Sequence, residues 1–178
     1  MKKLILICLI SHMSLFAYTY DAAIKDYQAK KYKEVCLKSS TSNLIRTKDE
    51  NMLSMIGDAC AKVDYINPLA HVIRGLISTP EFRENGSYFA TLVLQKKLIY
   101  QFMNDGINLK NLRLPRSNHT LSIVFENLAK NNYTKEEGKI AIKIDSKKYI
   151  VWITDEKKRV VHVDVYEYGQ KIKSHWYL

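Results

Sequence analysis

Three polar side chains near the end of the chain have the chemistry to bind a metal ion. His162 and Asp164 alternate with apolar residues and so share one face of a predicted strand, and His175 lies in the next alternating segment. Imidazole and carboxylate groups are common ligands of Zn²⁺. The outer face of a strand also commonly carries polar residues that contact only solvent, and no further partner pattern accompanies these three. We therefore interpret them as surface residues and predict no metal site and no cofactor.

The other residues that could act in catalysis are scattered along the chain. No Gly-x-Ser-x-Gly, His-Glu-x-x-His or glycine-rich phosphate-binding motif occurs. His119 lies just before a predicted helix, where Ser117 or Asn118 is expected to be the capping residue. His71 is expected on the surface of another helix. Because catalysis needs a positioned acid, base or nucleophile, we predict no catalytic residues, and an enzyme with an unrecognised site is the remaining alternative.

Cys36 and Cys60 are predicted to form a disulfide. They are the two cysteines that remain after removal of a predicted export signal, and a pair of cysteines in an exported protein usually bridges. The bridge closes a loop of about 25 residues, which corresponds to roughly 3 kcal/mol of stability by the loop-entropy relation. No Cys-x-x-Cys motif is present, so a redox-active thiol is the weaker alternative.

The export signal is predicted over residues 1–17. Lys2 and Lys3 precede a short apolar segment at 4–10, and a less apolar stretch ends at Ala17, after which we expect cleavage. No apolar run reaches the roughly 20 residues that a membrane span needs. We therefore expect a periplasmic or secreted protein, with an uncleaved N-terminal anchor as the alternative.

Beyond the signal, the hydrophobic period changes along the chain. Residues 18–105 place apolar side chains at spacings of three and four, which is typical of helices, and the longest helix is expected over Ser87 to Met103. Residues 106–135 are predicted to form a connector and a last helix. Residues 136–178 alternate apolar and polar positions between short turns, which predicts a four-stranded antiparallel meander with one face packed on the last helices. The predicted fold class is therefore α+β, with antiparallel helical hairpins before the meander.

Within the helical region, similar residue types recur 34 residues apart. The pairs are Ala23 with Gly57, Tyr32 with Ile66, Val35 with Leu69 and Cys36 with Ala70. This spacing resembles the tetratricopeptide repeat over about residues 20–78. Both copies lack the aromatic residue that opens the family motif and the proline that closes it, and antiparallel hairpins with a coincidental spacing are the alternative. The resemblance implies an interaction scaffold whose concave face takes a peptide or a partner helix.

The charge is the second indication of function. The chain has 28 Lys and Arg against 18 Asp and Glu, and removal of residues 1–17 takes away two lysines and no acid, which leaves a net charge of +8. Such a charge favours anionic partners. It also keeps helix faces and hairpin turns soluble. Export and the lack of a recognition motif argue against nucleic acid, so we expect none as a partner.

The expected function is protein binding. We expect an exported, non-enzymatic scaffold or assembly protein that binds an envelope protein or peptide. The alternative is a cationic binder of an anionic envelope polymer or membrane surface. The candidate partner contacts on the helices are Tyr27, Tyr32, Tyr65 and Tyr100.

Overall fold

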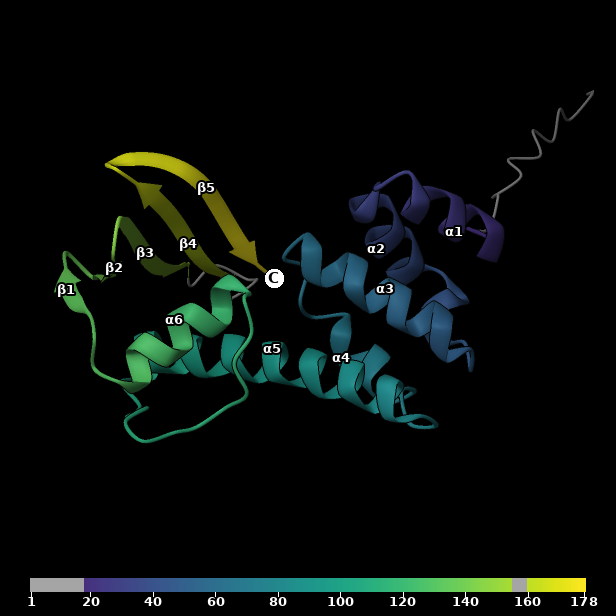
Figure 1. Cartoon of the computed structure of the whole chain (residues 1–178), viewed down its shortest axis with the longest axis horizontal. Helices are drawn as coiled ribbons and strands as arrows, with labels where there is room; N and C mark the ends of the chain where they lie inside the picture. Colours follow the sequence, from purple (N-terminus) through teal and green to yellow (C-terminus); the bar gives the residue numbers. More distant parts are fainter. Residues whose placement is uncertain (1–17, 155–159) are drawn as a thin grey trace, which may run out of the picture.

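The computed structural model describes residues 18–154 and 160–178 and has the predicted α+β fold (Figure 1). The predicted export signal lies outside these residues. Within them, helices precede an antiparallel sheet. The helices are α1 (Tyr20–Gln28), α2 (Tyr32–Thr41), the 3-10 helix η1 (Asn43–Arg46), α3 (Glu50–Lys62), α4 (Leu69–Ile73), α5 (Pro80–Asp105) and α6 (Thr120–Ala129). The strands are β1 (Thr134–Glu136), β2 (Lys139–Ile144), β3 (Lys147–Thr154), β4 (Val160–Glu167) and β5 (Gln170–Tyr177).

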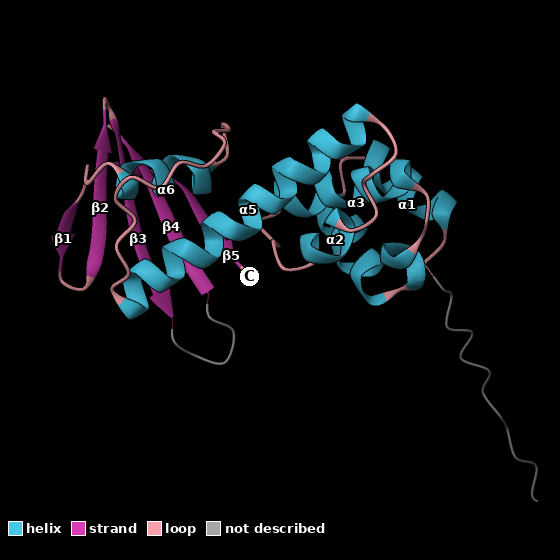
Figure 2. Ribbon diagram, turned by 90° about the horizontal axis from the view of Figure 1, so that it is seen from below, coloured by secondary structure: helices cyan, strands magenta, loops and turns pink. Residues whose placement is uncertain are grey.

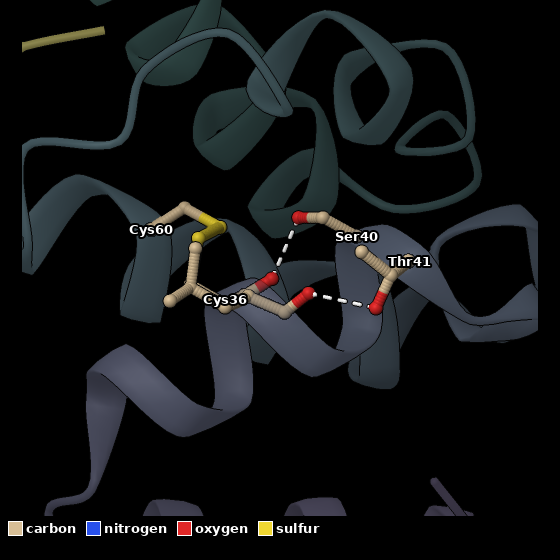
Figure 3. Close-up of a disulfide and its surroundings, with 5 residues drawn as sticks. Cys36, Ser40, Thr41 and Cys60 are labelled. Carbon is tan, nitrogen blue, oxygen red and sulfur yellow. Dashed lines mark hydrogen bonds between the residues drawn. A yellow bond between two sulfur atoms is a disulfide. The ribbon is translucent and has the colours of Figure 1, made fainter. Parts of the chain in front are cut away.

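The predicted disulfide joins α2 to α3 (Figure 3). Cys36 and Cys60 are both fully buried, with their Cα atoms 4.9 Å apart. Just beyond the bridge, the Ser40 and Thr41 hydroxyls donate to backbone carbonyls of their own helix, which satisfies these polar groups at its end. The disulfide therefore sits inside the helical core and closes the chain between its second and third helices.

Helix α5 belongs to both halves of the molecule (Figure 2). It starts at Thr79, whose hydroxyl accepts the Phe82 N–H, and ends at Gly106, whose φ of 68° suits a left-handed cap. Its first part packs on α3 and α4, and its last part packs on α6, β3 and β4. The prediction of a helix starting at Ser87 was therefore too short, because the Thr79-Pro80 start signal opens this same helix.

The sheet has five strands in the order β1-β2-β3-β4-β5, and every neighbouring pair is antiparallel. The prediction of four strands was wrong, because the short strand β1 adds a fifth strand to the sheet. Two-residue turns explain the tight hairpins, because Glu137 and Gly138, and likewise Tyr168 and Gly169, all have positive φ. β1 lies at the end of the sheet far from α1 to α4, and β5 lies nearest these helices (Figures 1 and 2).

The two faces of the sheet have different surroundings. The inner face packs on α6 and the last part of α5, as the alternation predicts, and joins a core that is continuous with the helical half. Both helices lie on this one side of the sheet (Figures 1 and 2). The buried inner-face residues are Ile140, Ile142, Tyr149, Val151, Val161, Val163, Val165, His175 and Tyr177.

Candidate functional site

The outer face of the sheet carries a row of side chains that runs across the strands. The register pairs Trp152 of β3 with His162 of β4, and His162 with Trp176 of β5. Lys139 of β2 extends the row, because the pairing of Ile140 with Val151 places it beside Trp152. We call Lys139, Trp152, His162 and Trp176 the cross-strand row.

Members of the row contact one another in sequence. The Trp152 and His162 rings are stacked at 5.0 Å with an interplanar angle of 7°, and the His162 and Trp176 rings meet edge to face at 5.2 Å. The Lys139 ammonium lies 5.4 Å from the centre of the Trp152 ring. Trp176 ends the row on the last strand and is 63% exposed, while His162 is only 7% exposed.

Sequence reasoning missed this row, although its signal was present. The alternation over residues 136–178 predicts strands at Trp152 and His162, but only the hairpin register brings the two rings opposite each other. Residues 155–159, which connect these strands in sequence, lie outside the described residues. Both tryptophans of the chain belong to the row.

The three residues considered for a metal site do not converge. His162 and Asp164 share the outer face as predicted, but His175 pairs with Val163 and so lies on the inner face. The interpretation of the three as surface residues was wrong, because neighbouring strands and side chains bury all of them. Asp164 accepts hydrogen bonds from Ser174 and Lys171. Burial lowers the pKa of His162, and the Asp164 charge opposes that shift. Residues 18–154 and 160–178 contain no group of three His, Cys, Asp or Glu side chains suited to a metal ion.

Positive charge is in excess around the row. Glu136 pairs with Lys148 across 3.2 Å, and the Asp164–Lys171 contact is 3.4 Å long. Within the described part of the chain, Lys139 and Lys143 form no ion pair with a carboxylate. The outer face therefore presents lysines that lack a direct ion pair, next to exposed aromatic surface.

Strand β5 is the longer free edge of the sheet. Its residues 170–174 are all exposed, and the β4–β5 register shifts between Val165 and Tyr166, which leaves Ile172 of β5 without a partner. The opposite edge, β1, has only three residues. Just beyond the C-terminal end of β5 the backbone is already paired, because the Ile66 and Asn67 N–H groups both donate to the Leu178 carbonyl oxygen.

A buried polar contact joins the two halves of the molecule near the C-terminal end of β5. His175 Nδ1 lies 2.8 Å from a carboxylate oxygen of Asp64, and its Nε2 lies 3.2 Å from the Thr120 hydroxyl. His175 is 5% exposed, and its ring stacks on that of Tyr177. Asp64 lies just after α3, and its backbone has a left-handed conformation with φ of 64°. We call Asp64, Thr120 and His175 the junction contact.

The order of groups in the junction contact resembles that of a Ser-His-Asp hydrolase, but its surroundings do not suit that chemistry. Such a site needs amide groups beside the nucleophile that can bind an oxyanion. The Leu121 N–H donates to His119 Nδ1, and the Ser122 N–H donates to the His119 carbonyl. The amides that follow Thr120 are therefore in use, and we interpret the junction contact as structural.

His119 is also structural, and the prediction for this loop was wrong in detail. The capping residue of α6 is His119 itself, whereas Ser117 accepts the His119 N–H and contacts Ser122. Nε2 of His119 lies 3.4 Å from the Ala61 carbonyl oxygen, so the hydrogen of the neutral ring is on Nε2. Burial lowers the pKa of His119, which favours that neutral form.

The four tyrosines expected to contact a partner lie in different places. Tyr27 and Tyr32 come together with ring centres 5.3 Å apart, and the Lys62 ammonium lies over both rings. The Tyr27 hydroxyl donates to Asp58, and burial together with this bond raises the pKa of Tyr27.

The remaining two tyrosines are separate from that pair. Tyr65 is half-buried against the core just after α3, and Tyr100 lies on α5 in a surface hollow that it shares with Leu94, Lys97 and Gln101. The structure thus brings Tyr27 and Tyr32 together and leaves Tyr65 and Tyr100 elsewhere.

Lys96, on the same helix as Tyr100, is a buried cation that sequence reasoning did not single out. It is 8% exposed, and its ammonium donates to the Asn67 side-chain oxygen over 2.8 Å. Burial, aided by the charge of Lys97, lowers the pKa of Lys96 to about 8. A lysine with a strongly lowered pKa is often found at functional sites. Its partner Asn67, however, also donates its backbone N–H to the Leu178 carbonyl oxygen. We therefore interpret Lys96 as a structural residue where the two halves of the molecule meet.

None of the helices in residues 18–154 and 160–178 combines the length and apolarity that a bilayer crossing needs. Comparison of the chain with protein-family models, with curated proteins and with solved structures found no match.

Proposed function

We propose that this chain is an exported, non-enzymatic scaffold or assembly protein that binds another protein of the cell envelope. The observation that carries the proposal is the outer side of the sheet, on which no described helix packs and which holds the cross-strand row and the free edge at β5. Exposed aromatic surface beside unpaired cations is typical of binding surfaces rather than of catalytic sites. Trp176, at 63% exposure, is the most prominent apolar side chain of this surface.

The compartment is part of the proposal. The Cys36–Cys60 disulfide supports an oxidising environment, because cytosolic proteins rarely keep such bridges. The charge and hydrophobic pattern of residues 1–17 supports export by the general secretory route. We therefore propose a periplasmic or secreted location.

The helical half is proposed as a tetratricopeptide-like support for the binding surface. In support, Ala23 and Gly57, the small residues of the 34-residue spacing, are both buried within the helical half. At Gly57 the neighbour is the Phe89 ring of α5. The Tyr27–Tyr32 pair would add a second, smaller contact with the partner.

The test is cross-linking in intact cells, followed by affinity purification at low and high salt and mass spectrometry. Wild type is compared with Trp176→Ala, and Tyr168→Ala serves as the matched control because Tyr168 is an exposed aromatic residue in the β4–β5 turn. We expect wild type and the control to recover one envelope protein at both salt concentrations. Trp176→Ala should recover at least fivefold less of that protein. Equal recovery by all three would contradict a role for the outer face.

A second candidate function is a cationic binder of an anionic polymer or membrane surface. The unpaired Lys139 and Lys143 on the outer face favour it. Binding through such charges falls steeply as salt is raised, whereas aromatic and backbone contacts persist. Recovery of polymer, lipid or many proteins only at low salt would therefore favour this candidate over the scaffold.

A further inference from the structure

We propose that β5 binds an extended, acidic segment of the partner protein as a sixth strand of the sheet. This inference rests on the proposed scaffold function and names the partner's binding element. It commits to strand addition at residues 170–176, with backbone hydrogen bonds providing affinity and the side chains of β5 providing specificity.

The backbone of β5 has the geometry that strand addition needs. On one side, β5 pairs with β4 from Gln170 to Tyr177, except at a register shift that leaves Ile172 without a partner. On the other side, an edge strand presents every second N–H and C=O group outward, and these groups bond either to water or to another strand. Among the described residues, backbone hydrogen bonds at this end begin only with the Leu178 carbonyl. The available edge therefore runs from Gln170 to Trp176.

The cross-strand row continues naturally into a sixth strand. One side of Trp176 contacts His162, and the next position of the row lies beyond the edge of β5. A residue paired opposite Trp176 would stand about 5 Å away, as each existing member of the row stands from its neighbour. An apolar or aromatic side chain there would cover the ring that the protein leaves 63% exposed.

Charge selects the occupant. Lys171 and Lys173 both lie on the free edge strand. Lys171 forms an ion pair with Asp164, which also accepts a hydrogen bond from Ser174, and Lys173 forms no ion pair with any described carboxylate. A second copy of this chain paired edge to edge would bring these lysines against each other, which like-charge repulsion disfavours. An acidic strand would be attracted by the same lysines. The edge charges thus oppose self-association and favour an acidic partner.

The experiment uses three synthetic seven-residue peptides with blocked ends and the mature protein. The first alternates glutamate with valine, the second has lysine in place of glutamate, and the third is the acidic peptide with a central proline. Because both tryptophans lie in the cross-strand row, intrinsic fluorescence reports binding without a label. Amide hydrogen exchange measured by NMR at residues 170–176 reports the new backbone bonds.

The inference predicts saturable binding of the acidic peptide, with a shift of the tryptophan emission and at least tenfold slower exchange of the outward amides of β5. The proline peptide and the basic peptide should bind at least tenfold more weakly. The double variant Lys171→Glu with Lys173→Glu should lose the acidic peptide by at least tenfold, and Lys110→Glu, an exposed change on the connector, should not.

Three results would overturn the inference. Absence of acidic-peptide binding up to millimolar concentration is one, equal binding of the proline peptide is another, and unchanged binding by the double variant is the third. A concentration-dependent dimer of the unliganded protein by light scattering, with protected β5 amides, would identify a second copy as the occupant instead.

The same double variant separates this inference from the proposed function. If cross-linking in cells recovers the envelope partner equally well with the double variant, the strand-addition mode is wrong while the scaffold function stands. If wild type recovers no protein partner, the scaffold function itself is wrong.

Discussion

At the scale of single residues, two positions show how closely the helical core is fitted. Lys96 is a cation enclosed by the fold, with one side-chain oxygen as its partner. Gly57 has no room for a methyl group, because a Cβ atom there would lie 2.4 Å from a carbon of the Phe89 ring. Each leads to a direct prediction about stability.

Replacement of Lys96 by methionine should make stability less dependent on alkaline pH. The fold lowers the pKa of Lys96 from 10.5 to about 8, so between these values the unfolded chain binds more protons and wild-type stability rises with pH. Below pH 8 the buried lysine is charged, and its burial lowers the free energy of unfolding by on the order of 3 kcal/mol, at about 1.4 kcal/mol per pKa unit. Urea unfolding at pH 7 to 10.5 should show a wild-type gain that Lys96→Met lacks.

The control for that prediction is Lys110→Met, which removes an exposed lysine. It should follow the wild-type pH dependence, because ionisation of the tyrosines affects all three proteins alike. Parallel curves for wild type and Lys96→Met would contradict the assignment of a lowered pKa to this lysine.

Substitution of Gly57 by alanine should destabilise the protein by about 1 to 3 kcal/mol through overpacking against Phe89. The better helix propensity of alanine offsets up to about 1 kcal/mol of that cost. Chemical denaturation measures the change. The double variant Gly57→Ala with Phe89→Leu gives the new methyl group space, so it should be less destabilised than the sum of its two single changes, and strict additivity would argue against the clash.

At the scale of elements, links between segments matter more than single contacts. The disulfide fixes α2 on α3. The His119 ring both caps α6 and contacts the Ala61 carbonyl in α3. The cross-strand row links the four strands from β2 to β5. Of these links, the His119 contact joins the elements most distant in sequence, because His119 and Ala61 are 58 positions apart.

Reduction of the disulfide should cost roughly 3 kcal/mol, because the unfolded chain regains the freedom of a 24-residue separation. Urea unfolding of the mature protein with and without reductant measures the loss. The double variant Cys36→Ala with Cys60→Ala should match the reduced protein and should not respond to reductant. Reactive thiols in protein taken from the oxidising compartment would show that the bridge does not form there.

Acid should destabilise the protein partly through His119. Because burial lowers its folded pKa below the ordinary value of about 6.5, the unfolded chain binds more protons just below that value and stability falls as the pH drops. His119→Asn keeps a capping acceptor without titrating, so its thermal midpoint should fall less between pH 6.5 and 5. His71→Asn, on the exposed side of α4, is the matched control, and the same loss in both variants would contradict this origin.

Much at this scale could be predicted from the sequence, because it follows from local rules. The helical period, the Thr79-Pro80 start and the Asn104-Asp105-Gly106 stop are all visible in the sequence, as is the alternation of β2 to β5. Strand β1 could not be predicted, because Thr134-Lys135-Glu136 is polar on both faces and is a strand only through its pairing with β2. The cross-strand row and the junction contact depend on register and tertiary packing, which spacing alone does not determine.

At the scale of the whole molecule, α5 makes one cooperative unit of two differently built halves. Its 26 residues extend about 39 Å at the standard rise, long enough to lie in both cores. The junction contact and the Leu178 carbonyl add polar links between the halves. The buried residues form one continuous cluster from Ala23 to Tyr177.

We therefore expect a single unfolding transition. Far-ultraviolet circular dichroism is dominated by the helices, and tryptophan emission reports only the sheet, because both tryptophans lie in the cross-strand row. The two signals should give the same denaturation midpoint and slope. Wild-type curves that separate by more than experimental error would show that the sheet unfolds independently of the helices.

The sharing of α5 also has a consequence for biogenesis. Ribosomes make the chain from its N-terminus, so the first part of α5 finds its partners α3 and α4 already made, while the last part, around Ile99 and Phe102, must await residues 120–178. At about 5 to 20 residues per second, the chain beyond α5 takes roughly 4 to 15 seconds to synthesise. During that interval the last part of α5 would expose apolar surface. A translocation route that keeps the polypeptide extended until its last residues have emerged would spare this protein from premature aggregation.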